Sequence, residues 1–393
     1  MNSFSALPKS DSSRIRVVHV ITGLHVGGAE RMLWKLLAQA ERTRFDMHVL
    51  CLLGDGRIGE EIRALGIPVT CLGIQSPAGA FMALGKLRRY LLAVSPDILH
   101  GWMYHGNLAA WFGRKLMGAT IPLVWGVRQS LYDLSREKPA TALVIRFSAI
   151  ISKAAAKILY NSETGRAHHE GIGYAPLHAE SIPNGFDTGI YRPDERARAG
   201  LRHELALGDK VPIVGMIARY DPMKGHGNFL DAAELLAGQN SDVHFVLVGR
   251  GVDGANPVFQ RVAKLPCLAG RIHFLGERQD IPALTAGLDV AVTPSVSEGF
   301  SNAIGEAMSC GVPCVVTDVG DSAKVVADCG RVVPPGDSAA LAQAIADVLQ
   351  MSSEARRDLG LRARQRVIDE FSISAVAGRY EALYESLAGS GRM

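Results

Sequence analysis

The sequence predicts an α/β protein built from two doubly wound parallel sheets. Its 393 residues are too many for one ordinary core and suit two domains. Short apolar runs rich in β-branched residues alternate with helical patterns along the whole chain. The runs are almost continuously apolar, which is typical of strands buried on both faces of a parallel sheet. This alternation predicts right-handed strand–helix–strand crossovers in each half.

Six strands are expected in each half of the chain. In the first half they are 15–21, 47–52, 69–71, 98–100, 123–125 and 157–160. In the second half they are 213–218, 244–248, 272–275, 290–293, 314–317 and 331–333. Helices are expected between them, for example over 29–40, 227–237 and 338–349.

The strand series restarts after residues 187–193, where a charged stretch predicted to be helical (194–210) precedes a fresh strand. We therefore predict an N-terminal domain over 1–187, a C-terminal domain over 188–372 and a terminal helix within 373–393 that packs back across the join. Open α/β sheets bind ligands outside the carboxyl ends of their strands. A cleft between the two domains is the expected active site.

Composition excludes several classes of protein. The net charge is only +3, and no basic stripe or finger spacing indicates a nucleic-acid partner. The polar residues 1–13 lack the apolar core of a signal peptide, and the apolar run over 141–151 is short and contains Arg146. The six cysteines are scattered and predict buried thiols in a reducing, cytoplasmic compartment. Cys310 and Cys314 do not resemble a zinc knuckle.

Basic residues cluster in the first half, at 86–89 and 114–115. An amphipathic, cationic helix of this kind is suited to touch an anionic membrane surface. A solvated helix face with extended basic side chains explains the same pattern. Both interpretations stay open.

Three patterns carry candidate chemistry. Gly27 and Gly28 follow the first strand and open a helix, so that backbone N–H groups can approach an anion, although tight turn chemistry is an equal explanation. Arg219 and Lys224 leave the carboxyl end of a strand and can neutralise a diphosphate, although surface cations at turns are common. Glu298, in the loop after a strand, is the first carboxylate of the third pattern.

In this third pattern, Glu306 follows Glu298 with seven residues between them, inside a helix expected to be capped near Ser301 or Asn302. Carboxylates accept hydrogen bonds from vicinal hydroxyls, and N–H groups at the start of a helix attract phosphate. An ordinary helix with an acidic first turn is the alternative.

The order of these motifs resembles glycosyltransferase family 4, retaining enzymes with the GT-B fold. The resemblance covers nearly the whole chain and runs through 27–30, 182–187, Arg219 with Lys224-Gly225, 248–251, 274–276, the Glu298…Glu306 pair and 330–337. It implies two Rossmann-like domains facing across a cleft, and a sugar transferred from a nucleotide donor.

The resemblance also implies roles for single residues. Arg219 and Lys224 match the cations on the donor diphosphate, Glu306 the carboxylate on the ribose, and Glu298 the one facing the sugar. The diphosphate or sugar is also expected to contact Gly299, Phe300 and Ser301, and the nucleobase to contact Phe274, Leu275 and Gly276. Gly27 and Gly28 are expected to close over the diphosphate. His105, just beyond strand 98–100 and before a helix, is expected beside the sugar.

The chain departs from the family at 320–324, where Lys324 stands near the position of a usual glutamate. No Asp-x-Asp triplet is present, so we expect no metal and no cofactor. The expected partners are a UDP-sugar donor, a saccharide or lipid-linked acceptor and a peripheral contact with an anionic membrane at its cytoplasmic face. The alternatives are a nucleotide-sugar epimerase of the same architecture and a non-catalytic sugar-nucleotide sensor.

Overall fold

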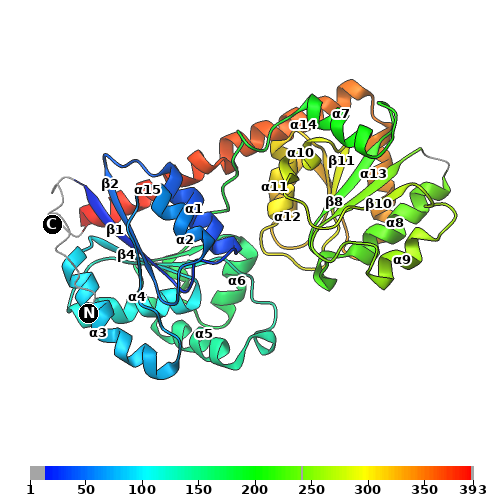
Figure 1. Ribbon diagram of the computed structural model, residues 1–393. Helices are drawn as coiled ribbons and strands as arrows, with labels where there is room; N and C mark the ends of the chain where they lie inside the picture. The colour runs from blue at the N-terminus through cyan, green and yellow to red at the C-terminus, as the bar shows by residue number, and fades with distance from the viewer. Residues whose placement is uncertain (1–13, 240–241, 391–393) are drawn as a thin grey trace. The chain divides into compact units, whose positions relative to one another are not determined.

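The computed structural model describes residues 14–239 and 242–390 (Figure 1). The segment 1–13, on which the expectation about a signal peptide rests, lies outside these residues. The chain forms two compact units. Among the described residues, one unit comprises 14–185 and 376–390, and the other comprises 186–239 and 242–375.

The first unit contains a seven-stranded parallel sheet in the order β3-β2-β1-β4-β5-β6-β7. Its strands are β1 (Ile15–Ile21), β2 (Phe45–Cys51), β3 (Val69–Cys71), β4 (Ile98–Trp102), β5 (Leu123–Val127), β6 (Lys157–Tyr160) and β7 (Ala179–Ser181). Its helices are α1 (Gly28–Gln39), α2 (Arg57–Ala64), α3 (Pro77–Val94), α4 (Met103–Met117), α5 (Pro139–Ile151), α6 (Glu163–Gly171) and α15 (Ile373–Ser390), with short 3-10 turns η1 (Leu134–Arg136), η2 (Ser152–Ala154) and η3 (Pro176–His178).

The second unit contains a six-stranded parallel sheet in the order β10-β9-β8-β11-β12-β13. Its strands are β8 (Ile213–Ile217), β9 (His244–Val248), β10 (Ile272–Phe274), β11 (Val290–Thr293), β12 (Cys314–Thr317) and β13 (Gly330–Val333). Its helices are α7 (Glu195–Glu204), α8 (His226–Gly238), α9 (Pro257–Ala263), α10 (Ile281–Ala286), α11 (Asn302–Ser309), α12 (Ser322–Val326), α13 (Ser338–Gln350) and α14 (Ser353–Arg366), with 3-10 turns η4 (Pro222–Lys224) and η5 (Ala327–Cys329) and a π-helical turn η6 (Val367–Phe371).

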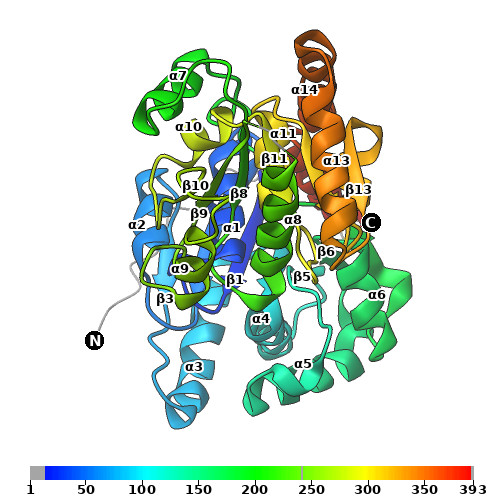
Figure 2. The same ribbon diagram turned by 90° about the vertical axis from the view of Figure 1, so that its right-hand side faces the viewer.

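Each sheet is covered on both faces by helices, as the apolar strands predict. In the first unit, α3, α4 and α5 pack on one face, while His19 of β1 and His100 of β4 point to the other face, toward α15. In the second unit, α8, α9 and α13 share a core on one face, and α10, α11 and α14 share another (Figure 2).

The predicted fold of two Rossmann-like parallel sheets is confirmed. All twelve expected strands are present, and the edge strand β7 is an additional one. The charged stretch 194–210 is helical only over α7. The cysteines are free; Cys71 and Cys267 are half-buried and the other four are buried. Within the described part of the chain, no helix combines the length and apolarity needed to cross a membrane.

In both sheets the strand order reverses next to the first strand of the unit. The reversal lies between β1 and β4 in the first unit and between β8 and β11 in the second. Loops that leave the carboxyl ends of the two strands at such a point diverge and leave room for a ligand. The topology therefore directs attention to the loops after β8 and β11, and after β1 and β4.

Candidate active site

The loops after β8 and β11 carry most of the residues that the sequence pointed to. Arg219 follows β8 and leads into the turn η4, whose last residue is Lys224. Glu298 lies in the loop that connects β11 to α11, and Glu306 lies in the second turn of that helix. All four side chains are thus presented at the switch point of the second sheet.

The turn that presents the two cations is built by Asp221. Its carboxylate accepts a hydrogen bond from the backbone N–H of Met223 at 3.0 Å and forms an ion pair with Arg219 at 2.9 Å. These two contacts hold the pKa of Asp221 below its usual range. Arg219 remains largely exposed, with 58% of its side chain accessible. The guanidinium is therefore held in place but open to an anion.

Gly225 allows the turn to lie against the loop after β11. Its φ of 73° is in the left-handed region, and a Cβ there would collide with the carbonyl of Pro294. The backbone N–H of Val296 donates to the carbonyl of Met223 at 2.9 Å. The two loops are consequently joined by backbone contacts, which fixes Lys224 beside the loop that carries Glu298.

Lys224 and Glu298 form a direct ion pair, with Nζ 2.6 Å from Oε1. The hydroxyl of Ser295 donates to the same carboxylate oxygen at 2.9 Å. Only 9% of the Glu298 side chain is accessible, against 26% for Lys224. The pair is therefore mostly shielded from water, which strengthens its attraction.

The loop around Glu298 packs against residues 320–324, the segment that departs from the family pattern. Gly320 has a φ of 57°, and a Cβ on it would collide with the carbonyl of Glu298. The backbone N–H of Asp321 donates to the carbonyl of Gly299 at 3.0 Å. Lys324 lies in α12 with an exposed side chain.

The start of α11 differs from the expected cap. Ser301 is the N-cap residue, but its side chain makes no capping hydrogen bond. Ser301 is instead buried, and its neighbour Phe300 stacks on Phe186 with ring centroids 6.1 Å apart. Packing rather than a side-chain cap therefore positions this helix, and its first N–H groups donate no hydrogen bond to the side chain of Ser301.

Three adjoining pockets connect the predicted residues of the second unit. One contains Lys224, Glu298 and Ser301, and a second contains Glu306. The third, of about 260 Å³, contains Arg219 with Gly249, Arg250, Glu277, Arg278 and Ile281. Ile217, at the end of β8, lines all three.

The residues expected near a nucleobase lie beside the third pocket. Gly276 accepts a hydrogen bond from the backbone N–H of Gly249 at 2.8 Å. Leu275 packs against the core on the α11 side, and Phe274 packs on Phe259 at 4.7 Å on the other face. The Phe274 ring is thus occupied by core packing, and the backbone of this segment is what borders the pocket.

The candidate residues of the first unit lie at its own switch point. Gly27 is the N-cap of α1 and Gly28 is its first residue, with the carboxylate of Glu30 folded back against Gly27. His105 was expected before a helix, but β4 continues to Trp102 and α4 begins at Met103. His105 therefore lies in the first turn of α4, half-buried, and burial lowers its pKa.

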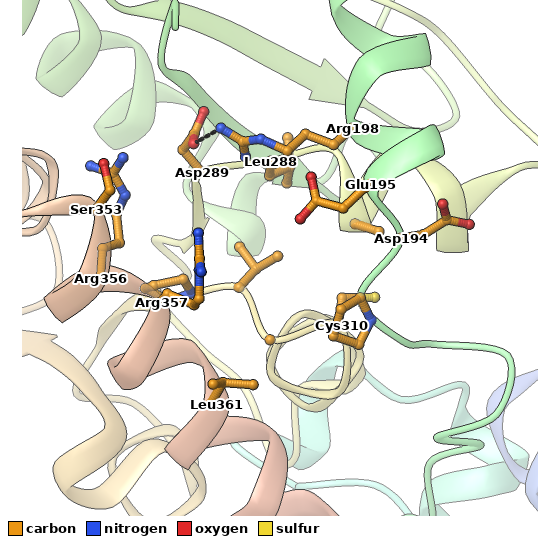
Figure 3. A pocket seen from close by; sticks show the side chains of 15 residues that line it. Asp194, Glu195, Arg198, Leu288, Asp289, Cys310, Ser353, Arg356, Arg357 and Leu361 are labelled. Carbon is orange, nitrogen blue, oxygen red and sulfur yellow. Dashed lines mark hydrogen bonds and ion pairs between the residues drawn. The ribbon is translucent and has the colours of Figure 1, made fainter. Parts of the chain in front are cut away.

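A separate pocket of about 370 Å³ lies at the amino ends of strands in the second sheet, away from the loops described above (Figure 3). It is lined by Asp289 and Pro313, which precede β11 and β12, and by Arg198, Arg356 and Arg357 among others. Figure 3 shows the contact between Arg198 and Asp289. None of the residues predicted from sequence lines it, and its charges are of both signs.

Sequence reasoning missed Asp221, Ser295 and the two arginines of the third pocket. Asp221 had a local signal, because an Asp side chain often accepts a hydrogen bond from the backbone N–H two residues further along the chain, which forms an Asx turn. Ser295 had none, since its role depends on a contact with Glu298. Arg250 lies in the segment 248–251 of the family resemblance but was given no role, and the position of Arg278 shortly after a strand was its only signal.

The chain matches two families of known proteins. Residues 26–189 match Glycosyltransferase Family 4, and residues 211–351 match Glycosyl transferases group 1, so the two matches together cover more than half of the chain.

Individual glycosyltransferases also match this chain over most of its length. The UDP-Gal:alpha-D-GlcNAc-diphosphoundecaprenol alpha-1,3-galactosyltransferase of Escherichia coli is 27% identical over 79% of this chain and 81% of its own length. The phosphatidyl-myo-inositol mannosyltransferase of Mycobacterium leprae is 29% identical over 78% of each chain. Among solved structures, Anabaena Alr3699/HepE in complex with UDP is similar in fold, with a TM-score of 0.81 at 22% identity, over 95% of this chain and 100% of that one.

Proposed function

Because the chain belongs to glycosyltransferase family 4, we propose that it transfers a sugar, with retention of configuration, from a UDP-sugar to a saccharide or lipid-linked saccharide in envelope polysaccharide synthesis. Family membership makes it a glycosyltransferase, and the epimerase and sensor alternatives are set aside. The observation that carries the donor proposal is the shielded Lys224–Glu298 pair beside Arg219 at the switch point of the second sheet. The E. coli relative is named for UDP-Gal and a lipid diphosphate acceptor, and the Anabaena protein for UDP.

The donor diphosphate would lie between Arg219, Lys224 and the first N–H groups of α11. Lys224 has three N–H donors, so it can keep Glu298 and still bind a phosphate oxygen. As the bond from sugar to phosphate breaks, negative charge grows on the leaving diphosphate and these donors stabilise it. Comparable donors elsewhere contribute about 3 kcal/mol each to the transition state.

Retention follows if the acceptor attacks from the same face as the leaving group. The departing β-phosphate then takes the proton of the acceptor hydroxyl, while the sugar passes through an oxocarbenium-like state. Glu298 is proposed to face the sugar and Glu306 to accept hydrogen bonds from the ribose hydroxyls. The roles that the resemblance implies for Gly27, Gly28 and His105 stay predictions, because these residues belong to the other unit.

We also propose that no divalent metal takes part, since two side-chain cations and a helix start supply the positive charge. Lys224→Ala and Glu306→Ala should each lower turnover by roughly a hundredfold or more, while Lys210→Ala, an exposed lysine before β8, serves as the matched control. UDP release would be measured with a panel of UDP-sugars and a membrane lipid extract, with and without a chelator. Normal turnover of both site variants would contradict the donor site, and loss of activity with chelator would contradict metal independence.

A lipid-linked acceptor requires contact with a membrane, and the first unit offers a face for it. Helices α3, α4 and α5 pack on the same face of the sheet, and Figures 1 and 2 show them along one side of the unit. The three helices contain no Asp or Glu. Their basic residues are Lys86, Arg88, Arg89, Arg114, Lys115 and Arg146.

Apolar side chains are exposed on the same helices. On α5, Leu143 is 69% exposed, Phe147 37% and Ile150 76%, a spacing that places them on one side of the helix. On α3, Phe81 is 79% exposed and Met82 72%. Exposed apolar residues among cations are typical of a helix that lies in the interface of an anionic bilayer. We propose that this face, the α3–α5 surface, holds the enzyme at the cytoplasmic side of the membrane.

A further inference from the structure

Ser295 is a buried serine whose hydroxyl donates to the carboxylate assigned to the transferred sugar. Its Oγ lies 2.9 Å from Oε1 of Glu298, the same oxygen that pairs with Nζ of Lys224 at 2.6 Å. Only 1% of Ser295 is accessible, so it has almost no surface to offer a ligand. Any effect of Ser295 on a bound nucleotide sugar must therefore pass through the groups that it contacts.

The backbone on both sides of Ser295 is fixed by the neighbouring turn η4. Before it, the carbonyl of Pro294 lies so close to Gly225 that a Cβ on the glycine would collide with it. After it, the backbone N–H of Val296 donates to the carbonyl of Met223 at 2.9 Å. Ser295 is thus held beside the turn by contacts that do not involve its own side chain.

A third support comes from the adjacent strand β12, which pairs with β11 in the sheet. The hydroxyl of Thr317, the last residue of β12, donates to the carbonyl of Ser295 at 2.5 Å. Thr317 is completely buried. The sheet therefore holds the loop after β11 at the residue whose hydroxyl reaches Glu298.

We propose that Ser295 is a positioning residue, which fixes the Glu298 carboxylate for its contact with the transferred sugar. An O–H and an N–H donor from two different loops meet on one oxygen and define where the carboxylate lies before the nucleotide sugar arrives. The side chain then need not be ordered on binding, which removes an entropic cost. A hydrogen bond to a charged acceptor is also stronger than one between neutral groups. The proposal rests on the sugar-facing role proposed for Glu298 and adds the residue that orients it.

Calorimetry tests this role without knowledge of the acceptor, by comparing UDP with a UDP-sugar. The UDP-sugar is whichever of UDP-glucose, UDP-galactose and UDP-N-acetylglucosamine binds most tightly to the wild-type protein. Ser295→Ala removes the hydroxyl and should weaken the UDP-sugar by roughly tenfold relative to UDP. The ratio of the two affinities is the readout, because an effect on the diphosphate alone changes both ligands and cancels.

Two milder variants follow the same contacts. Ser295→Cys keeps a weaker donor at the same position and should change the ratio less than Ser295→Ala does. Thr317→Val keeps the shape of the side chain but removes the hydroxyl that supports Ser295, and it should shift the ratio in the same direction. Ser309→Ala is the matched control. It deletes a buried hydroxyl of the second unit that donates to the carbonyl of Gly305 at 2.6 Å, and it should leave the ratio unchanged.

A double-mutant cycle distinguishes an effect through Glu298 from a general loosening of the loop. In the Glu298→Ala background, Ser295→Ala should not change the ratio further, because the carboxylate that Ser295 orients is absent. An undiminished effect of Ser295→Ala in that background, or an unchanged ratio in Ser295→Ala with a normal circular dichroism spectrum, would overturn the positioning role.

Glu298→Ala alone separates the two levels of the proposal. If it changes the ratio and Ser295→Ala does not, only the inference about Ser295 fails. If Glu298→Ala leaves the ratio intact, the sugar-facing role proposed for Glu298 fails as well.

Discussion

Two carboxylates of the second unit are shielded from water, and their surroundings give them different tasks. Glu298 forms an ion pair with Lys224 at the carboxyl ends of the strands, and the ammonium group of Lys224 keeps further N–H donors for a ligand. Asp289 at the opposite edge is closed in by two arginines, Arg198 at 2.6 Å and Arg202 at 2.5 Å. It also accepts the backbone N–H of Ile213 at 2.8 Å. Asp289 therefore joins α7 to β8, and its recorded contacts hold the fold together.

Replacing Asp289 by Ala should destabilise the protein strongly, because Arg202, whose side chain is only 2% accessible, would keep a buried charge without its carboxylate. Breaking a buried pair in this way costs about 3–5 kcal/mol. Urea unfolding of the full chain measures the change. Asp328→Ala is the control, since its pair with Arg362 is exposed at 81% and 59% and should contribute less than about 1 kcal/mol. Equal effects of the two variants would contradict this account.

At the scale of elements, the C-terminal helix α15 is anchored in the first unit by a buried aromatic cluster. The hydroxyl of Tyr384 lies 2.7 Å from Nδ1 of His100, and the indole N–H of Trp102 donates to Nδ1 of His19 at 3.0 Å. Arg128 donates to the hydroxyl of Tyr380 at 2.8 Å. Two turns of α15 thus close over the central strands β1 and β4.

This cluster makes stability depend on pH. Burial, aided by His48, lowers the pKa of His19 to about 3, and burial together with His19 and Arg128 lowers the pKa of His100. Both side chains are neutral when folded but bind protons near pH 6.5 when unfolded. Their contribution to the free energy of unfolding is therefore complete above pH 6.5. It falls as the pH drops below that value, by up to about 1.4 kcal/mol per pH unit for each histidine.

Urea unfolding at pH 7.5, 6.0 and 5.0 measures this slope. His19→Gln should flatten it, whereas His203→Gln, on the exposed side of α7, should leave it unchanged. The expectation is wrong if the free energy of unfolding of the wild-type protein does not decrease between pH 6.0 and 5.0, or if both variants change the slope equally.

The elements differ in how clearly the sequence predicts them. The buried strands could be read directly, because strands such as β8 and β12 are apolar at nearly every position. The edge strand β7 has only three half-buried residues, Ala-Glu-Ser, and carries no such pattern. Local contacts such as the Asp221 turn leave a signal in the sequence. The Lys224–Glu298 pair joins residues 74 positions apart, and spacing alone gave no indication of it.

At the scale of the whole molecule, the net charge conceals how the charges are distributed. The total is only +3, with 42 basic and 39 acidic residues in the chain. Helices α3, α4 and α5 nevertheless lack acidic residues altogether, so the α3–α5 surface is positive although the molecule is almost neutral. We propose that the protein meets an anionic membrane through this surface, because cationic and exposed apolar side chains lie together on it.

Flotation with lipid vesicles tests this orientation. The wild-type protein should float with phosphatidylcholine vesicles that contain phosphatidylglycerol at low salt, and should dissociate as salt screens the charges. Lys86→Glu with Arg89→Glu should abolish flotation, since each basic residue contributes about 1 kcal/mol near an anionic surface. Ile150→Ser removes an apolar contact and should weaken it. Leu177→Ser is the matched control, because Leu177 is 94% exposed but lies outside the three helices. Absence of flotation at low salt, or equal loss in the Leu177 variant, would show that the α3–α5 surface does not meet the membrane.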